Sequence, residues 1–503
     1  MTDHTYLEDL VEQLAAAGPR AVVRCEGQDT SGAELLDAIH RYAHVLDDVG
    51  IGRGDLVAMY APNRPEALAL RYATHLVGAG SVYLSAPPDA GRRALLLVDL
   101  DPQLIVVFPE TAHLLPLTPA RVGAIGEVPG MALRLDQLAA TAAADPLAGR
   151  ARPGDLAVII SSGGTTGVPK GSVRDFATWA AMVAGPRRPE RRQLANGRLP
   201  YLTQQLVDTT LLGGGTVVLQ DGYDPVSTLE AIEAEAITDL FLVEPQLVEL
   251  MDHPDVQRRD LSSLRAVTHI GAYAAPVLRM RARDRLGPVI AHTYGASEIG
   301  IVSALSAAEH DLGHPERFGC AGRIFPGVDV RFRRPDGALD ATEGSIEVRS
   351  PAMASGYRNR PLEEATRFAH GWYRTGDLGH LDPDGYLHIH GRAVDCTRIE
   401  GRLVSPVGLQ DVLCRQPDVR YAVVVLDPHT GHRIAALVAW PSRGIDLDAC
   451  RTVLLEEFGE PIADGVRFLP VDRIPLTEQG KPHRPEIRRL AAEMPETAPA
   501  GAA

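Results

Sequence analysis

The segment 161–171, with the sequence SSGGTTGVPKG, carries the densest set of groups in the chain that could bind a phosphate. Its glycines allow backbone N–H groups to turn toward an anion, its threonine hydroxyls add donors, and Lys170 adds a positive charge. The run 155–160 directly before it is typical of a short buried strand that ends at this loop. The residues therefore predict a phosphate-binding loop.

This loop differs from the P-loop of common nucleotide hydrolases, which requires Gly-Lys-Ser/Thr at the start of a helix. Pro169 stands where that motif has glycine, and Gly171 stands where it has serine or threonine. Proline removes an N–H donor at a point where a P-loop would use one. An ordinary P-loop enzyme is therefore disfavoured, and a plain surface turn does not explain two threonines followed by a lysine.

Four further segments carry side chains that a nucleotide-using enzyme could employ. One offers the ring of Tyr294, which could stack on a purine, and Glu298, which could bind Mg²⁺. Asp377 lies in a polar turn and could accept the hydroxyls of a ribose, and Arg392 follows in the next motif. Lys481 lies on a glycine-flanked turn near the C-terminus. Taken singly, each has an ordinary explanation, such as an Asx turn or a solvated lysine.

Composition and charge limit the classes of protein to be considered. The chain has 503 residues, which is enough for more than one domain, and a net charge of −15, which gives no support for nucleic-acid binding. Its five cysteines are scattered and form no CxxC pair, as is typical of a reducing compartment. No signal-peptide pattern and no membrane-spanning apolar run is evident, so we expect a cytoplasmic protein without a membrane partner.

The order of strand and helix patterns predicts an α/β fold with two domains. Alternating patterns up to about residue 318 indicate mostly parallel βαβ subdomains, with Ser31 as the N-cap of a helix over 31–46. Short strands and Gly/Pro turns from residue 319 onward indicate a small antiparallel subdomain. We predict an N-terminal domain, a hinge, a small mobile α+β domain and a disordered tail at 1–391, 392–395, 396–490 and 491–503.

Together and in this order, the five motifs resemble those of the adenylate-forming superfamily. That superfamily contains acyl-CoA synthetases, adenylation domains of peptide synthetases and luciferases, and the resemblance extends from about residue 30 to about residue 484. It implies that a carboxylate attacks the α-phosphate of ATP to give acyl-AMP and pyrophosphate. A nucleophile then takes the acyl group and releases AMP. Because two anions must meet in the first step, positioning and fixed positive charge would supply most of the catalysis.

The resemblance implies a role for each residue that matches a family motif. The β- and γ-phosphates of ATP would be bound by Ser162, Gly163, Gly164, Thr165, Thr166, Gly167 and Lys170. The adenine slot would be formed by Gly271, Ala272, Tyr273 and Tyr294. The ribose hydroxyls would be bound by Asp377, with Arg392 alongside, and Mg²⁺ by Glu298 and Thr166.

The remaining implied roles concern catalysis, the hinge and the acid. Lys481 would reach into the site from the small domain and bridge the acid's carboxylate and the α-phosphate, and Asp395 would be the hinge. The implied catalytic set is Lys481, Glu298, Thr166 and Lys170. The acid pocket would be lined by Tyr201, Asp208, His269, Gly271, Gly295 and Ile301.

The chain departs from the family pattern at four positions. Gly163 replaces a serine or threonine of the loop, and Thr203 stands where a histidine often ends a Pro-aromatic-X-His segment. Arg398 stands where lysine is frequent, and Gly408 where glutamate is common. These changes affect the acid and acceptor sides more than the nucleotide side, so adenylation is the better supported of the two steps.

The acid and the acceptor are less strongly indicated than the nucleotide. Large and polar side chains around residues 201–208 favour a compact acid, such as an aromatic or heterocyclic one, over a long fatty chain. CoA is the first acceptor to consider, a free amine the second, as in a stand-alone amide bond synthetase, and a carrier-protein thiol the third. A catalytically inert nucleotide-binding relic is a further alternative, although such a protein would have no need for both Lys481 and Asp377.

Overall fold

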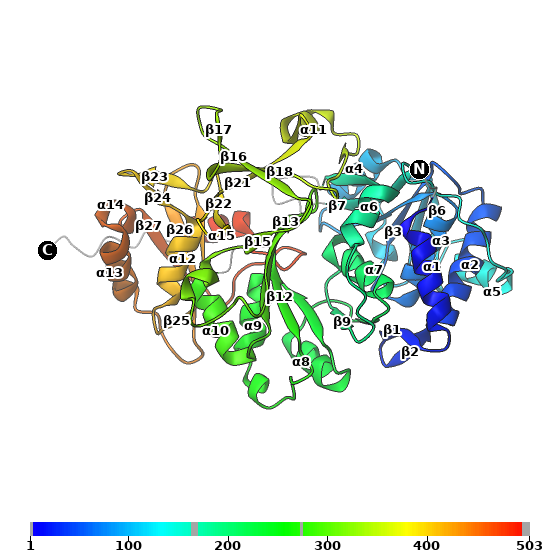
Figure 1. Ribbon diagram of the computed structural model, residues 1–503, viewed down its shortest axis with the longest axis horizontal. Helices are drawn as coiled ribbons and strands as arrows, with labels where there is room; N and C mark the ends of the chain where they lie inside the picture. The colour runs from blue at the N-terminus through cyan, green and yellow to red at the C-terminus, as the bar shows by residue number, and fades with distance from the viewer. Residues whose placement is uncertain (1–3, 162–169, 272–274, 495–503) are drawn as a thin grey trace.

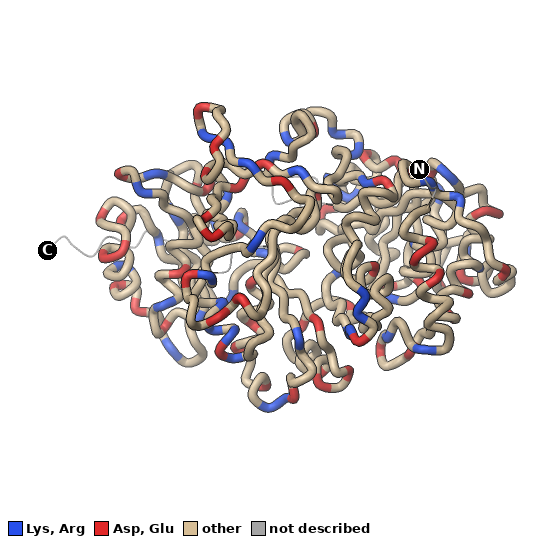
Figure 2. The backbone as a smooth tube through the Cα atoms, viewed as in Figure 1, with Lys and Arg blue, Asp and Glu red and all other residues tan. Residues whose placement is uncertain are grey.

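The computed structural model describes residues 4–161, 170–271 and 275–494. Figure 1 shows the blue N-terminal strands and the orange C-terminal strands at opposite ends of the long axis, with the green sheet between them. Positive and negative residues are interspersed over the whole length of the chain (Figure 2). Within the described ranges, no helix is long and apolar enough to cross a membrane.

A sheet of seven strands, in the order β19-β8-β7-β4-β3-β5-β6, forms the N-terminal end of the molecule. The five strands from β7 to β6 run parallel, which confirms the predicted βαβ pattern. Their bounds are β3 (Leu56–Tyr60), β4 (Gly80–Tyr83), β5 (Leu104–Val107), β6 (Arg121–Ala124), β7 (Leu156–Ser161), β8 (Gly171–Asp175) and β19 (Gly356–Tyr357). The neighbouring helices are α2 (Gly32–Asp48) and α3 (Pro65–Leu76), and Ser31 caps α2 as predicted.

A second sheet of nine strands, in the order β15-β14-β13-β12-β11-β9-β10-β1-β2, lies in the middle of the molecule. The six strands from β13 to β1 are parallel, so their carboxyl ends meet at one edge, where α/β proteins commonly bind ligands. The bounds are β1 (Ala21–Cys25), β2 (Gln28–Ser31), β9 (Arg192–Ala195), β10 (Thr216–Leu219), β11 (Asp239–Leu242), β12 (Ala266–Ile270), β13 (Ile290–Ala296), β14 (Gly300–Leu305) and β15 (Arg323–Ile324). Helices α8 (Pro225–Ala234), α9 (Glu244–Met251) and α10 (Pro276–Leu286) connect or flank these strands.

An antiparallel sheet follows, as predicted for the segment after residue 319. Its strands are β16 (Asp329–Arg333), β17 (Leu339–Asp340), β18 (Glu343–Arg349), β20 (Phe368–Ala369), β21 (Trp372–Leu381) and β22 (Leu387–Arg392). Asp377 on β21 lies opposite Arg392 on β22, because these two strands pair in register at that point. The strand pairing thus brings the two predicted ribose-binding side chains together.

The C-terminal part has its own three-stranded sheet and helices, in agreement with the predicted α+β pattern. The main elements are β23 (Thr397–Ile399), β24 (Arg402–Val404), α12 (Pro406–Cys414), β25 (Val419–Leu426), β26 (Arg433–Ala439), α13 (Leu447–Phe458), β27 (Val466–Pro470) and α15 (Arg484–Glu493). Because α15 continues to Glu493, the residues 491–493 are helical, and the predicted disordered tail began too early. Residues 495–503 lie outside the described ranges.

Asp208 belongs to the packed interior and not to the acid pocket for which it was predicted. It lies fully buried on α7 (Gln204–Leu212), where it accepts hydrogen bonds from both terminal nitrogens of Arg71 at 2.7 and 2.8 Å. Tyr72 Oη and Trp179 Nε1 donate to the same carboxylate at 2.6 and 2.9 Å. The carboxylate is saturated with donors from α3 and from α6 (Phe176–Val183), so it fixes α7 in place.

A buried carboxyl group also joins the two domains. Glu244, the first residue of α9, accepts hydrogen bonds from Tyr421 Oη at 2.7 Å and from Gln410 Nε2, both in the C-terminal part. Around this group, apolar side chains of α9, α10 and β12 pack in one continuous core with those of α12, β25 and β26. Burial raises the pKa of Glu244 to about 7, although both hydrogen bonds and the charge of Arg279 lower it.

The Asp208→Asn substitution should destabilise the protein by about 3–5 kcal/mol, because it leaves the charge of Arg71 buried without its counter-ion. The matched control is Asp329→Asn, which breaks a half-exposed pair with Arg349 and should cost at most about 1 kcal/mol. Urea titrations give both free energies of unfolding. Equal losses for the two variants would contradict the structural role of Asp208.

The pKa of Glu244 predicts a pH dependence of stability. The folded chain keeps this carboxyl protonated up to about pH 7, whereas the unfolded chain releases the proton near its ordinary pKa of 4.5. Raising the pH between these values should therefore remove stability at up to about 1.4 kcal/mol per unit, with no further loss above the upper value. Urea titrations at several pH values should show a flatter dependence for Glu244→Gln, and an unchanged slope would refute the prediction.

Candidate active site

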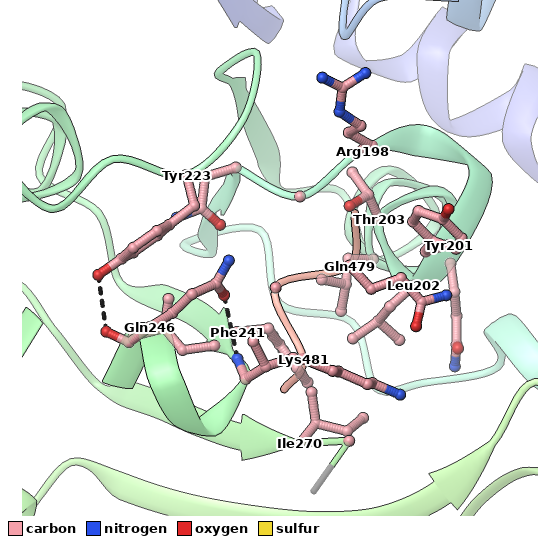
Figure 3. A pocket seen from close by; sticks show the side chains of 18 of the residues that line it. Arg198, Tyr201, Leu202, Thr203, Tyr223, Phe241, Gln246, Ile270, Gln479 and Lys481 are labelled. Carbon is pink, nitrogen blue, oxygen red and sulfur yellow. Dashed lines mark hydrogen bonds between the residues drawn. The ribbon is translucent and has the colours of Figure 1, made fainter. Parts of the chain in front are cut away.

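A cavity of about 520 Å³ lies at the carboxyl edge of the central sheet. Figure 3 shows the loop that carries Gln479 and Lys481 passing through it, with Tyr223 and Gln246 on one side and Tyr201 and Thr203 on the other. Strand β12 ends at the cavity with Ile270 and Gly271, β11 brings Phe241, and the strand pair β13–β14 brings Gly295 and Ile301. The cavity is therefore built by the N-terminal domain and entered by a loop of the C-terminal domain.

Lys481 is held against the backbone of Gly271. A Cβ atom on Gly271 would lie 3.0 Å from Cε and 3.3 Å from Nζ of the lysine, and Gly271 has a φ of +84°. Burial and the charge of Arg392 lower the pKa of Lys481, while Glu298 and Asp377 act in the opposite direction. The ammonium group thus lies in a confined position within the electrostatic reach of both carboxylates.

The lysine loop is attached to the N-terminal domain by Glu478. Its carboxylate accepts hydrogen bonds from the backbone N–H of Ala86 at 3.2 Å and from Tyr201 Oη at 3.0 Å. Within the loop, the N–H of Thr477 donates to the carbonyl of Lys481 at 2.7 Å, which closes the turn. Tyr201 therefore has two functions in the structure, because it lines the cavity and also fixes the loop that carries the lysine.

The predicted ribose site is assembled from three side chains. Tyr294 Oη donates to Asp377 Oδ2 at 2.7 Å, and Arg392 Nε lies 3.3 Å from Asp377 Oδ1. Asp377 is buried, and its backbone N–H donates to Thr375 Oγ1 at 3.0 Å. The carboxylate is thus fixed in orientation beside the aromatic ring that was predicted to contact adenine.

Glu298 and Lys170 are brought together by Tyr357 of strand β19. Tyr357 Oη donates to Glu298 Oε1 at 2.8 Å, Ser297 Oγ donates to Oε2 at 2.9 Å, and Lys170 Nζ lies 5.5 Å from the centre of the Tyr357 ring. In the described ranges, no group of three metal-binding side chains occurs. One carboxylate nevertheless fits Mg²⁺ that is bound together with nucleotide phosphates, because such ions take few protein ligands.

Part of the predicted nucleotide site falls outside the described residues. This applies to the loop residues Ser162, Gly163, Gly164, Thr165, Thr166 and Gly167, and to Ala272 and Tyr273. Their roles remain predictions. Asp395, the predicted hinge, is among the described residues: it is buried and forms an ion pair with Arg484, three residues beyond Lys481.

The structure corrects two residues predicted for the acid pocket and adds others. Tyr201, Gly271, Gly295 and Ile301 line the cavity, whereas Asp208 and His269 do not. His269 points to the opposite side of β12 from Ile270, because side chains alternate along a strand. It stacks on His292 with ring centres 4.9 Å apart, and burial lowers its pKa to about 3.

Two of the cavity residues missed from the sequence come from one helix. Gln246 and Glu249 line the cavity from α9, and Phe241 and Tyr223 complete that side. The signal in the sequence was the spacing of three residues directly after strand β11, which places both side chains on one helix face. The sequence would have identified Gln246 and Glu249 as cavity residues only if the carboxyl end of strand β11 had been recognised as part of the cavity.

Fold and site together define an enzyme of the adenylate-forming class. The sequence profile described as AMP-binding enzyme matches residues 10–358, and the chain belongs to this family. It is therefore an ATP-dependent, AMP-forming acid ligase.

Relatives support this assignment over almost the full chain. The medium/long-chain-fatty-acid–CoA ligase FadD8 of Mycobacterium tuberculosis is 30% identical, over 91% of this chain and 85% of the relative. A feruloyl-CoA synthase from Amycolatopsis is 30% identical, over 94% and 97% of the two chains. The solved structure of the amide bond synthetase McbA from Marinactinospora thermotolerans is 30% identical, with a TM-score of 0.85, over 96% and 99%.

Gly271→Ala should slow adenylation roughly 10²-fold, because a methyl group would displace the lysine ammonium by a fraction of an ångström to an ångström. The measurement is acid-dependent exchange of labelled pyrophosphate into ATP, with Lys481→Ala as the reference for complete loss. Gly287→Ala is the control, since Gly287 has a similar φ of +83° but no atom within 4 Å of an added Cβ. An equal loss of exchange rate in the two glycine variants would show that backbone strain, and not contact with the lysine, causes the loss.

Proposed function

We propose that this protein activates a compact aromatic or heterocyclic acid as its acyl adenylate and joins it directly to an amine, giving an amide. The observation that carries the activation step is the position of Lys481, which enters a cavity of about 520 Å³ within reach of Asp377 and Glu298. A lysine in this place can draw an anionic acid and an anionic phosphate together. The alternative of an inert nucleotide-binding relic gives no reason for such a placement.

The described residues, together with the predicted role of Thr166, suggest how the first step proceeds. Asp377 would bind the ribose hydroxyls, oriented by Tyr294 and Arg392. Lys170 would stabilise the pyrophosphate that leaves, and Glu298 with Thr166 would hold Mg²⁺, which neutralises charge on the phosphates. The ammonium of Lys481 would lie between the attacking carboxylate and the α-phosphate and offset the negative charge that accumulates as the new P–O bond forms.

The size of the cavity supports a compact acid. Its 520 Å³ includes the edge of the nucleotide site at Gly295, so only part of this volume is available for the acid. The walls of that part are Tyr201, Phe241, Ile270 and Ile301, which suit a flat ring. A long acyl chain would need a continuous apolar tunnel, whereas this cavity also contains polar side chains such as Gln246.

An amine is the acceptor that we favour, and CoA is the second candidate. The amine is supported by the similarity to a solved amide bond synthetase over 99% of that enzyme, and by the departures at Arg398 and Gly408 on the acceptor side. CoA is supported by the names of FadD8 and feruloyl-CoA synthase. A carrier-protein thiol has weaker support than either.

Two measurements test this proposal. Exchange of labelled pyrophosphate into ATP with a panel of aryl acids and fatty acids identifies the acid, and we expect the fastest exchange with an aryl acid. Mass spectrometry of reactions that contain ATP, this acid and either CoA or a panel of amines then identifies the product. An amide formed without CoA supports the proposal, a thioester without amide would replace it with CoA ligation, and no exchange with any acid would favour the relic.

A further inference from the structure

One carboxylate in the cavity receives no hydrogen bond from the part of the chain that the structure describes. Glu249 lines the cavity from α9 and is half-buried. Among the described residues, it takes part in no hydrogen bond and no ion pair. By contrast, the other glutamate in the cavity, Glu478, is fully engaged with Ala86 and Tyr201. Glu249 therefore has free hydrogen-bonding capacity that faces a ligand-sized space.

Its position relative to the reacting centre follows from the helix. Gln246 precedes it by three residues on the same face of α9, and a Cβ atom on Gly480 would lie only 2.9 Å from Gln246 Nε2. The helix face thus packs against the lysine loop at Gln246, and Glu249 lies about 5–6 Å further along, one helical turn away. Tyr223 Oη donates to the carbonyl of Gln246 at 2.8 Å and closes this side of the cavity.

Folding stability does not account for a carboxylate at this place. Taking an ionised group partly out of water costs free energy unless hydrogen bonds replace its hydration, and Glu249 receives none from the described residues. A glutamine or leucine would fill the same volume at lower cost. Burial raises the pKa of Glu249 most strongly, the charge of Asp224 adds to this effect, and the charges of Arg420 and Arg473 favour the ionised form.

The chemistry of the possible ligands selects one of them. The acid substrate, ATP and CoA are all anionic, so a carboxylate would repel each of them. An amine offers the opposite character, because its N–H groups donate hydrogen bonds and it must lose a proton when it forms an amide. A group that accepts this proton has to lie in the cavity but away from the lysine, which is where Glu249 lies.

We propose that Glu249 binds the amine acceptor and accepts its proton in the second step. This inference rests on the proposed amide-forming function. The neutral amine attacks the carbonyl carbon of the acyl adenylate, the new C–N bond forms, and AMP leaves with the electron pair of the C–O bond that breaks. The nitrogen passes one hydrogen to the Glu249 carboxylate and keeps the other in the amide when the amine is primary. Burial raises the pKa of Glu249, which makes it a stronger base than an exposed glutamate.

The test compares Glu249→Gln with Glu456→Gln, an exposed glutamate of α13 that serves as the matched control. Each protein receives the purified acyl adenylate of an aryl acid and an aniline, an amine that is uncharged at neutral pH. We expect Glu249→Gln to lower the rate of amide formation roughly 10²-fold, and by at least about tenfold more than it lowers pyrophosphate exchange. Below the pKa of Glu249 the wild-type rate should fall, and this fall should be absent in Glu249→Gln.

The outcomes separate failure of this inference from failure of the proposed function. If the wild type makes a thioester with CoA and no amide, both are wrong. If the wild type makes the amide and Glu249→Gln does so at the control rate, only the role of Glu249 is wrong. A variant that instead raises the KM for the acid, with an unchanged KM for the amine, would place the acid beside Glu249 and overturn the assignment.

Discussion

The structure depends on one geometric requirement: a lysine that belongs to one domain must lie inside a cavity built by the other. Lys481 can reach Gly271 only while the C-terminal domain is packed against α9, α10 and β12. Two contacts set this orientation. Glu478 attaches the lysine loop to Ala86 and Tyr201, and the shared core buries the carboxyl of Glu244 between the domains. The side chains on β13 and β21 that are predicted to bind the nucleotide would act together with Lys481 only in this orientation.

Helix α9 connects this requirement with the rest of the site. Its first residue, Glu244, contacts the C-terminal domain, Gln246 packs beside Gly480, and Glu249 lies one turn further along the cavity. This helix therefore links the domain contact, the lysine loop and the proposed acceptor position within about one and a half turns. On the other side of the cavity, the buried pair of Arg71 and Asp208 fixes α7, and with it the segment that carries Tyr201.

The sequence predicted best what is encoded locally. The strand predicted at 155–160 and the helix predicted at 31–46 lie within two residues of their observed bounds, because an apolar run and a serine N-cap are local signals. Lys481, Asp377, Arg392 and Glu298 were indicated by motifs that each lie within a few consecutive residues. Only the resemblance to the adenylate-forming superfamily implied that these four side chains lie close together in the folded protein.

Long-range pairing explains what could not be predicted. The partner that removes Asp208 from the pocket, Arg71, is 137 residues away, and nothing in the local sequence marks the pair. Likewise, His269 was predicted to line the cavity, but the next residue of its strand, Ile270, does so instead. A shift of one position along a strand moves a side chain to the opposite face. Glu249 was missed because a glutamate on an amphipathic helix ordinarily faces solvent.

The two carboxyl groups of α9 lie in different surroundings. Glu244 is part of the domain contact, whereas Glu249 is the proposed proton acceptor. Glu244 is buried, its donors Tyr421 and Gln410 are neutral, and its pKa of about 7 keeps it protonated below that pH in the domain contact. Glu249 is half-buried and lies near Arg420 and Arg473, which favour the ionised form that a proton acceptor needs. Burial raises the pKa of both glutamates, but the carboxyl of Glu244 is enclosed by protein donors, whereas that of Glu249 faces the cavity. Because Glu249 belongs to the N-terminal domain, its place in the cavity does not depend on the orientation of the C-terminal domain, whereas that of Lys481 does.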